Sequence, residues 1–241
     1  LLSIPLLGCL PAGSAKWKPL SKHLWDMRRL VGANMYFKLE PIVDRYLLSS
    51  TAAGTLSLYG IAQLLHGSGG AVLGKVWGST AVTRLAEHAK ARRLPELRTL
   101  YYRNLILLVG VSLAAVALLA IGGALVLPKI DRIGQMTAAE LANLWQLALL
   151  LAGVLVGASS GTLLAGAFYA VGDTRTPTRM SILTFTLFVP LKCLAFDLGG
   201  VAGLCVATSL YYITNACMLF VLFRCRMRVF TTRVKGRNDF A

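Results

Sequence analysis

Three long stretches of the chain, residues 104–128, 141–172 and 198–223, contain no Asp, Glu, Lys or Arg. Each is longer than the roughly 20 apolar residues that a helix needs to cross a bilayer core. A helix satisfies its backbone N–H and C=O groups within its own segment, which a span without water requires. The whole chain is 56% hydrophobic with a mean hydropathy of +0.65, which is too apolar for a soluble domain. The sequence therefore predicts an all-α, polytopic transmembrane helical bundle.

The basic residues are unevenly distributed. The formal net charge is +15, and most of the 25 Lys and Arg fall into four clusters, at residues 16–29, 84–103, 175–179 and 224–237. A basic surface is also the footprint of a nucleic-acid binder. Here the clusters alternate with pairs of apolar segments, as they do in membrane proteins whose basic loops face the cytoplasm. We therefore interpret the charge as a determinant of topology and expect no nucleic acid as a partner.

The clusters also place the weaker segments. Because consecutive cytoplasmic loops need an even number of crossings between them, each interval holds a helical hairpin. The predicted arms are residues 30–50 and 55–84, 104–128 and 141–172, and 176–196 and 198–223. We expect residues 1–29 to be the end of a truncated helix plus a basic loop, residues 30–228 a six-helix transmembrane lobe, and residues 229–241 a basic cytoplasmic tail.

The first arm carries four charges, Lys38, Glu40, Asp44 and Arg45. Ionisable groups at membrane depth usually face a cavity or one another. At about 100° per residue, Lys38 and Arg45 share one helix face, and Glu40 and Asp44 share nearly the opposite face. Cations that face a cavity could hold a diphosphate. Alternatively, Lys38 and Arg45 snorkel to an interface or pair with acids of neighbouring helices. Lys75 on the second arm could likewise face a cavity or snorkel to an interface, and the sequence does not decide between the two.

Two arms carry glycine at every fourth residue. The sets are Gly70, Gly74 and Gly78 on one arm, and Gly153, Gly157 and Gly161 on the other. Such spacing forms one groove along a helix and lets membrane helices approach closely. It predicts two packing seams, with flexing during a transport cycle as the alternative.

The sequence offers no pattern for catalysis, a metal or a cofactor. Its five cysteines lack Cys-x-x-Cys spacing, so small buried apolar side chains are the expected role. Residues 69–75 have the Gly-x-x-x-x-Gly-Lys skeleton of a phosphate-binding loop, but Val76 stands where Ser or Thr would bind magnesium. We predict that the chain is not an enzyme.

A short polar turn separates the fourth and fifth arms. Gly172 is expected to end one helix, Asp173 or Thr174 to cap the next, and Pro177 to lie in its first turn. The residues that distinguish this turn are Phe168, Tyr169, Asp173, Thr174, Arg175, Thr176 and Pro177. They resemble the Phe-Tyr-Ala-x-x-Asp-Thr-x-Thr-Pro turn of the MurJ/MviN lipid II flippases, a family of the multidrug/oligosaccharidyl-lipid/polysaccharide exporter superfamily.

The similarity extends over most of the chain. A second stretch resembles the seventh and eighth helices of that family through residues 43–45, Ser49, Gly54, Leu56, Ser57, Ala62 and residues 72–74. The whole resemblance covers about residues 30–228. The family fold has two six-helix lobes and a final pair of helices. The resemblance therefore implies that this chain is the second lobe of a two-lobe exporter fold, and that a first lobe is its partner in the full-length protein.

The resemblance also implies a function. The lobe would help to move a lipid-linked diphosphate-oligosaccharide, a lipid II-like peptidoglycan precursor, across the bacterial cytoplasmic membrane, with membrane lipids around it. Lys38, Arg45 and Lys75 would attract the head group, and Glu40 or Asp44 would fix these cations or couple to an ion. A single lobe is not expected to transport by itself.

The chain departs from the family at one place. After Ala62 the lipid II flippases usually carry an acid, an arginine and, three residues on, another acid, where this chain has Gln63, Leu64 and Gly67. Two alternatives remain open. The chain could be a cation-coupled drug or polysaccharide exporter of the same superfamily, with Glu40 and Asp44 as key residues, or a membrane scaffold that does not transport.

Overall fold

The computed structural model describes residues 36, 39–52, 54–91, 94–126, 132–133 and 136–238. The predicted helix end and basic loop at residues 1–29 lie outside this range, and so does Lys38. The helices are α2 (Glu40–Leu48), α3 (Thr55–Leu73), the π-helix η1 (Gly74–Gly78), α4 (Ser79–Lys90), α5 (Leu94–Val126), α6 (Ala138–Leu150), α7 (Ala152–Ala170) and α8 (Arg175–Asn238). A two-stranded antiparallel ladder, β1 (Arg132–Ile133) with β2 (Met136–Thr137), precedes α6.

The predicted helical bundle of three hairpins is confirmed. The first hairpin is α2 with the continuous α3–η1–α4 arm, and the second is α5 with α6 and α7. The third is α8 itself, because Gly200 breaks it into two arms, residues 175–199 and 201–238, with φ 56° and ψ −140°. These dihedral angles are open to glycine and strained for other residues.

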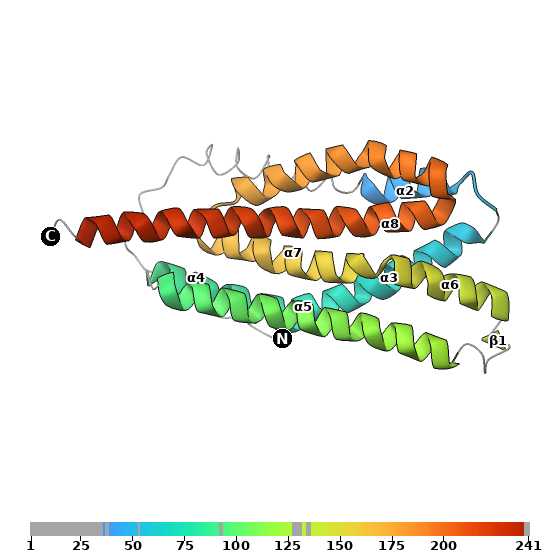
Figure 1. Ribbon diagram of the computed structural model, residues 1–241, viewed down its shortest axis with the longest axis horizontal. Coiled ribbons are helices and arrows are strands. Elements are labelled where there is room, and N and C mark those ends of the chain that lie inside the picture. Colours follow the sequence, from blue (N-terminus) through green and yellow to red (C-terminus); the bar gives the residue numbers. More distant parts are fainter. Residues whose placement is uncertain are drawn as a thin grey trace, which may run out of the picture.

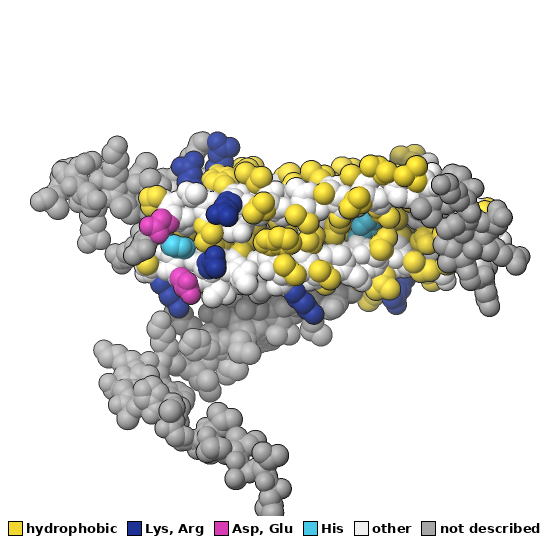
Figure 2. Space-filling view, turned by 90° about the horizontal axis from the view of Figure 1, so that it is seen from below, with side chains coloured by type: hydrophobic (Ala, Val, Ile, Leu, Met, Phe, Trp, Pro, Cys, Tyr) yellow, Lys and Arg dark blue, Asp and Glu magenta, His cyan; other side chains and the backbone are white. Residues whose placement is uncertain are grey.

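The long arms lie side by side, so the connections gather at the two ends of the bundle (Figure 1). The α4–α5 connection, the α7–α8 turn and the C-terminal end of α8 lie at one end, and β1 and the Gly200 break lie at the other. We call the first the basic end, because residues 84–103, 175–179 and 224–237 are the basic clusters of these segments. Figure 2 shows charged side chains gathered there, and mainly hydrophobic ones, with isolated Lys or Arg, along the rest of that face.

Three helical segments of the described residues are long and apolar enough to cross a membrane. They are Pro95–Leu125, Ala138–Ala170 and Arg175–Met227, and the last of them contains both arms of α8. The first hairpin is not among them, as expected for α2 from its charges and its short length. Apolar packing contributes to its place in the bundle. Leu48, Tyr59 and Ala62 belong to one buried core with Leu151 and Leu204.

The two predicted glycine seams differ. A Cβ on Gly157 would lie 2.5 Å from the backbone carbon of Tyr212, and one on Gly153 would lie 2.7 Å from the Cβ of Ser209, so α7 packs closely on the second arm of α8. By contrast, a Cβ on Gly70 or Gly74 would meet no atom of the described residues within 4 Å. Within the described part of the chain, the prediction of a packing seam is therefore wrong at Gly70 of α3 and Gly74 of η1, because no other helix lies against these two positions.

Exchanging one glycine for alanine in each row tests this difference. We expect Gly157→Ala to destabilise the chain by about 1–3 kcal/mol, the usual cost of overpacking, because the Tyr212 backbone cannot move aside. Gly70→Ala is the matched control and should stabilise by about 0.5–1 kcal/mol through helix propensity. The midpoint of unfolding of the purified chain in mixed detergent measures both. Equal effects would contradict the assignment of the seam.

Candidate functional site

A buried lysine is the centre of the polar interior. Lys192 lies on the first arm of α8 and is 1% exposed. Its Nζ lies 2.9 Å from Asp44 Oδ1 and 3.3 Å from Glu40 Oε1. The two acids are four residues apart on α2 and therefore lie on the same helix face, which is turned toward α8. One ammonium group thus bridges two carboxylates across a pair of helices.

The other carboxylate oxygens are also hydrogen-bonded. The Tyr59 hydroxyl donates to Asp44 Oδ2 at 2.8 Å, and the Gln63 amide donates to the same oxygen at 3.3 Å. The Tyr212 hydroxyl donates to Glu40 Oε2 at 3.1 Å. We call these six residues, Glu40, Asp44, Tyr59, Gln63, Lys192 and Tyr212, the ionic cluster. The cluster joins α2, α3 and both arms of α8, and every oxygen of its acids has a donor, which buried charges require.

A groove of about 610 Å³ opens beside the ionic cluster. It is lined mainly by residues of α2 and α3, together with Val154 of α7 and Tyr212 of α8. Arg45 lines the groove and is exposed, unlike its neighbour Asp44, which is 1% exposed. Among the residues that the structure describes, no carboxylate is paired with Arg45. The volume falls within the range of pockets that bind small molecules.

The predicted site residues are only partly brought together. Arg45, Glu40 and Asp44 all line the groove. Lys75 is exposed on η1 and does not line it; at about 1.5 Å per residue it lies about 12 Å further along the helix than Gly67, the last groove residue of α3. The acids turn toward Lys192 and away from the exposed Arg45, as the opposite faces of the sequence pattern predict.

Sequence reasoning missed Lys192 as a partner of these acids. A signal was available, because a lysine inside an apolar arm needs a counter-charge and α2 supplies two buried acids. What the sequence does not give is which arms are neighbours in space. Sequence reasoning also missed Tyr59 and Tyr212, because nothing in the sequence near these tyrosines indicates that they donate hydrogen bonds to Asp44 and Glu40.

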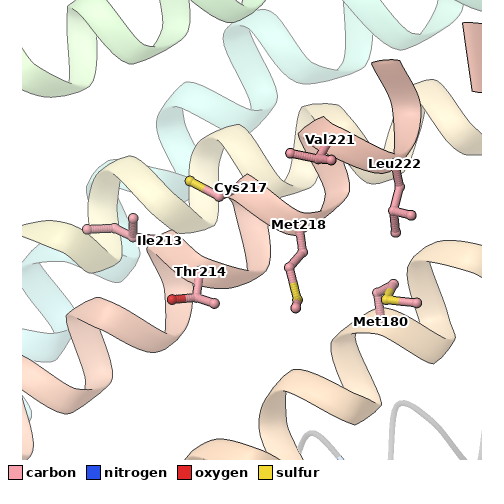
Figure 3. Close-up of a pocket in the computed structure, with 7 residues that line it drawn as sticks. All are labelled: Met180, Ile213, Thr214, Cys217, Met218, Val221 and Leu222. Atoms are coloured by element: carbon pink, nitrogen blue, oxygen red, sulfur yellow. The ribbon is translucent and has the colours of Figure 1, made fainter. Parts of the chain in front are cut away.

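A second groove, of about 420 Å³, lies between the two arms of α8. Figure 3 shows Met180 of the first arm facing Met218 and Leu222 of the second arm across the gap. Thr214 supplies the polar side chain of this lining, and the other residues are apolar or cysteine. This groove suits an apolar chain and lacks the charges that distinguish the groove beside Arg45.

The polar turn between α7 and α8 is a well-defined helix junction. The backbone N–H of Asp173 donates to the Phe168 carbonyl at 2.9 Å, and that of Gly172 donates to the Tyr169 carbonyl at 3.0 Å. With Gly172 at φ 79°, this is a Schellman motif, which ends a helix on a left-handed residue. Phe168 is fully buried and packs edge-on against Phe223, with the two ring centroids 5.2 Å apart. The end of α7 is therefore fixed in the core.

Asp173 then caps α8. Its carboxylate accepts hydrogen bonds from the backbone N–H groups of Arg175 and Thr176, both at 3.1 Å, and from the Thr176 hydroxyl at 2.6 Å. It is also paired with Arg226 on the second arm of α8. Of the two residues that the sequence allowed as the cap, Asp173 is the one whose side chain makes these bonds; Thr174 is exposed, and Pro177 is buried in the first turn of α8.

The charge state of Asp173 follows from these contacts. Partial burial raises the pKa of its carboxyl, but the hydrogen bonds from Thr176 and Arg175 and the nearby Arg226 guanidinium together outweigh burial. The pKa therefore lies below its ordinary value of 3.8. The turn lies at the basic end, whereas α2 and its acids lie away from that end (Figure 1). It is thus a structural junction and is separate from the groove.

These features define a class of protein. A bundle of apolar helical hairpins with ionisable side chains buried between its arms, beside an open polar groove, is typical of a multi-pass membrane transporter. A family model described as lipid II flippase MurJ matches residues 18–236, which is most of the chain. The chain therefore belongs to the MurJ lipid II flippase family, and the resemblance inferred from the turn is confirmed. Comparison with individual curated proteins gives no significant match.

Family membership places the chain among multi-pass proteins of the bacterial inner membrane that serve peptidoglycan synthesis. The family is one of transporters of a lipid-linked precursor and not of enzymes. Among the described residues, no group of three or more His, Cys, Asp or Glu is placed to hold a metal ion.

The junction gives a test of stability. We expect Asp173→Ala to destabilise the chain by about 1–2 kcal/mol, because the first turn of α8 loses its cap and Arg226 loses its partner. Thr174→Ala is the matched control, since the exposed Thr174 side chain does not cap the helix, and it should change stability by less than about 0.5 kcal/mol. The unfolding midpoint in detergent measures both variants.

The pH dependence of this contribution has a defined sign. Because the folded pKa of Asp173 is lowered, its stabilisation is complete above the ordinary value of 3.8 and is lost as the pH falls through the folded pKa. Wild-type chain should therefore lose more stability than Asp173→Asn when the pH is lowered below about 4. Parallel losses in the two proteins would show that Asp173 is not held ionised by the turn.

Proposed function

We propose that this chain is one lobe of a flippase that moves a lipid-linked diphosphate-oligosaccharide, a lipid II-like peptidoglycan precursor, from the cytoplasmic to the outer leaflet. Family membership supports the transport of such a precursor. The observation on which the proposal rests is Arg45, an exposed guanidinium in a groove whose acids are turned inward to Lys192.

Arg45 suits a diphosphate head group. A guanidinium presents a planar fork of N–H donors that can bind two phosphate oxygens at once, and it keeps its charge at any physiological pH. The nearby Asp44 does not cancel this charge in the groove, because its oxygens already accept hydrogen bonds from Lys192, Tyr59 and Gln63. Lys38 and Lys75 remain candidates for further contacts along the path of the head group.

The lipid tail would stay in the bilayer while the head group crosses. In this scheme the six-helix lobe of residues 30–228 rocks against a first lobe about a cavity between them, as in other two-lobe exporters. The basic end would face the cytoplasm, because basic clusters occupy cytoplasmic loops. The groove of Arg45 would then lie on the path between the two leaflets.

The departure at Gln63 has a physical reason in this chain. An acid at that position would face Asp44 with the same charge, whereas the Gln63 amide donates a hydrogen bond to Asp44 Oδ2 at 3.3 Å. Glutamine in place of the family acid is therefore compatible with the negative charge of Asp44 in the ionic cluster.

The cation-coupled alternative has a different requirement. Glu40 and Asp44 would have to exchange a free cation during transport, but Lys192 already neutralises one of the two charges and donors occupy all four oxygens. We therefore assign these acids to charge pairing.

Binding of a diphosphate lipid to the purified chain tests the role of Arg45. We expect Arg45→Gln to weaken binding of a polyprenyl diphosphate by about tenfold or more, the scale of one charge-assisted hydrogen bond. Neutral polyprenol should bind both proteins equally, because it shares the tail and lacks the diphosphate. Arg103→Gln, which removes an exposed charge from α5 outside the groove, is the control and should bind like wild type.

Two results would overturn the proposal. One is equal binding of the diphosphate lipid by wild type and Arg45→Gln. The other is that the neutral polyprenol binds as tightly as the diphosphate lipid, which would show that the groove does not recognise the head group. Binding that depends on the sodium concentration in wild type, and loses this dependence in Glu40→Gln/Asp44→Asn, would instead favour cation coupling.

A further inference from the structure

The groove beside the ionic cluster contains charges of both signs, although a phosphate-bearing ligand requires a positive one. Glu40, Asp44 and Arg45 all line it. Counted by formal charge, the two acids outweigh the arginine. A carboxylate close to a bound phosphate is strongly unfavourable at the low effective dielectric of a membrane protein. Something must therefore offset the acids if the groove is to accept an anion.

Lys192 meets that requirement without reaching the groove. Its side chain is 1% exposed and does not belong to the groove lining, so it is not placed to contact a ligand there. It donates to Asp44 at 2.9 Å and to Glu40 at 3.3 Å. Its ammonium also lies 5.7 Å from the centre of the Tyr211 ring, a further favourable contact for a cation. With Lys192 included, the formal charges of the cluster and Arg45 sum to zero.

We infer that Lys192 is a specificity-determining residue: it is the built-in counter-ion that makes this groove accept anionic, phosphate-bearing ligands and exclude free cations. It acts through Glu40 and Asp44 and is a positioning residue. The inference rests on the proposed function, since it assumes that Arg45 receives the phosphate. Without Lys192, the same oxygen atoms would present two uncompensated carboxylates, an environment that attracts cations and repels phosphate.

Thermal unfolding of the purified 241-residue chain in detergent tests this role with two probes. The first probe is inorganic pyrophosphate, and the second is sodium chloride exchanged for choline chloride at constant ionic strength. Wild type should be stabilised by pyrophosphate and should not respond to sodium. Lys192→Met should bind pyrophosphate about tenfold more weakly and should gain stabilisation by sodium, because one positive charge has been removed.

Three further variants separate charge from structure. Lys192→Arg keeps the charge and should resemble wild type. The triple variant Lys192→Met/Glu40→Gln/Asp44→Asn removes the acids together with their counter-ion and should recover pyrophosphate binding without a sodium response. Arg103→Gln, which removes a charge outside the groove, is the control and should leave both responses unchanged.

A lysine with a merely structural role would predict a different pattern, in which Lys192→Met is less stable but keeps its pyrophosphate affinity and gains no sodium response. That pattern, or a triple variant that does not recover pyrophosphate binding, would overturn the inference. If Lys192→Met does not fold, the variant Glu40→Gln provides the test, because it leaves a single acid opposite Lys192. This variant should bind pyrophosphate more tightly than wild type does. An unchanged pyrophosphate affinity would overturn the inference.

The proposed function can fail separately. If wild type does not respond to pyrophosphate while Lys192→Met still gains a sodium response, the diphosphate role of Arg45 is wrong and the counter-ion role of Lys192 stands. If neither response is seen in any variant, both are wrong.

Discussion

The burial of Lys192 between Glu40 and Asp44 is the interaction on which the arrangement of the arms depends. Charges removed from water are costly unless they are paired and hydrogen-bonded, and loss of one partner of such a pair typically costs about 3–5 kcal/mol. α2 spans Glu40–Leu48 and contributes few apolar contacts of its own. Its acids find their counter-charge on α8 and their remaining donors on α3 and α8. The position of α2, and with it that of Arg45, follows from this pairing.

The bundle separates its two kinds of interaction along its length. The Schellman motif at Gly172 and the cap by Asp173 fix the junction of α7 and α8 at the basic end, over an aromatic core that includes Tyr101, Phe168 and Phe223. The ionic cluster lies away from that end, where α2, α3 and α8 meet. The capped junction at the basic end and the polar groove away from it thus assign structural and chemically specific roles to different regions of the same six arms.

Features that depend on residues close together in the sequence could be predicted, whereas contacts between distant residues could not. The three hairpins and the α7–α8 turn are encoded locally, by apolar runs, basic clusters and capping residues, and the structure agrees with them. The different orientations of the adjacent Asp44 and Arg45, about 100° apart around the helix, also follow from helix periodicity alone. The partnership with Lys192 could not be assigned, because Lys192 is far from Asp44 in the sequence and nothing local states which arms are neighbours. The same limit explains Gly70 and Gly74, whose spacing matches a packing seam although no helix of the described chain covers them.

A double-mutant cycle between Asp44 and Lys192 tests the central interaction most directly. The free energy of unfolding would be measured for wild type, Asp44→Asn, Lys192→Met and the double variant in the same detergent mixture. A buried, hydrogen-bonded ion pair predicts a coupling energy of about 2–3 kcal/mol, with the double variant more stable than Lys192→Met alone. A coupling energy within about 0.5 kcal/mol of zero would contradict it, because residues that do not interact show additive effects.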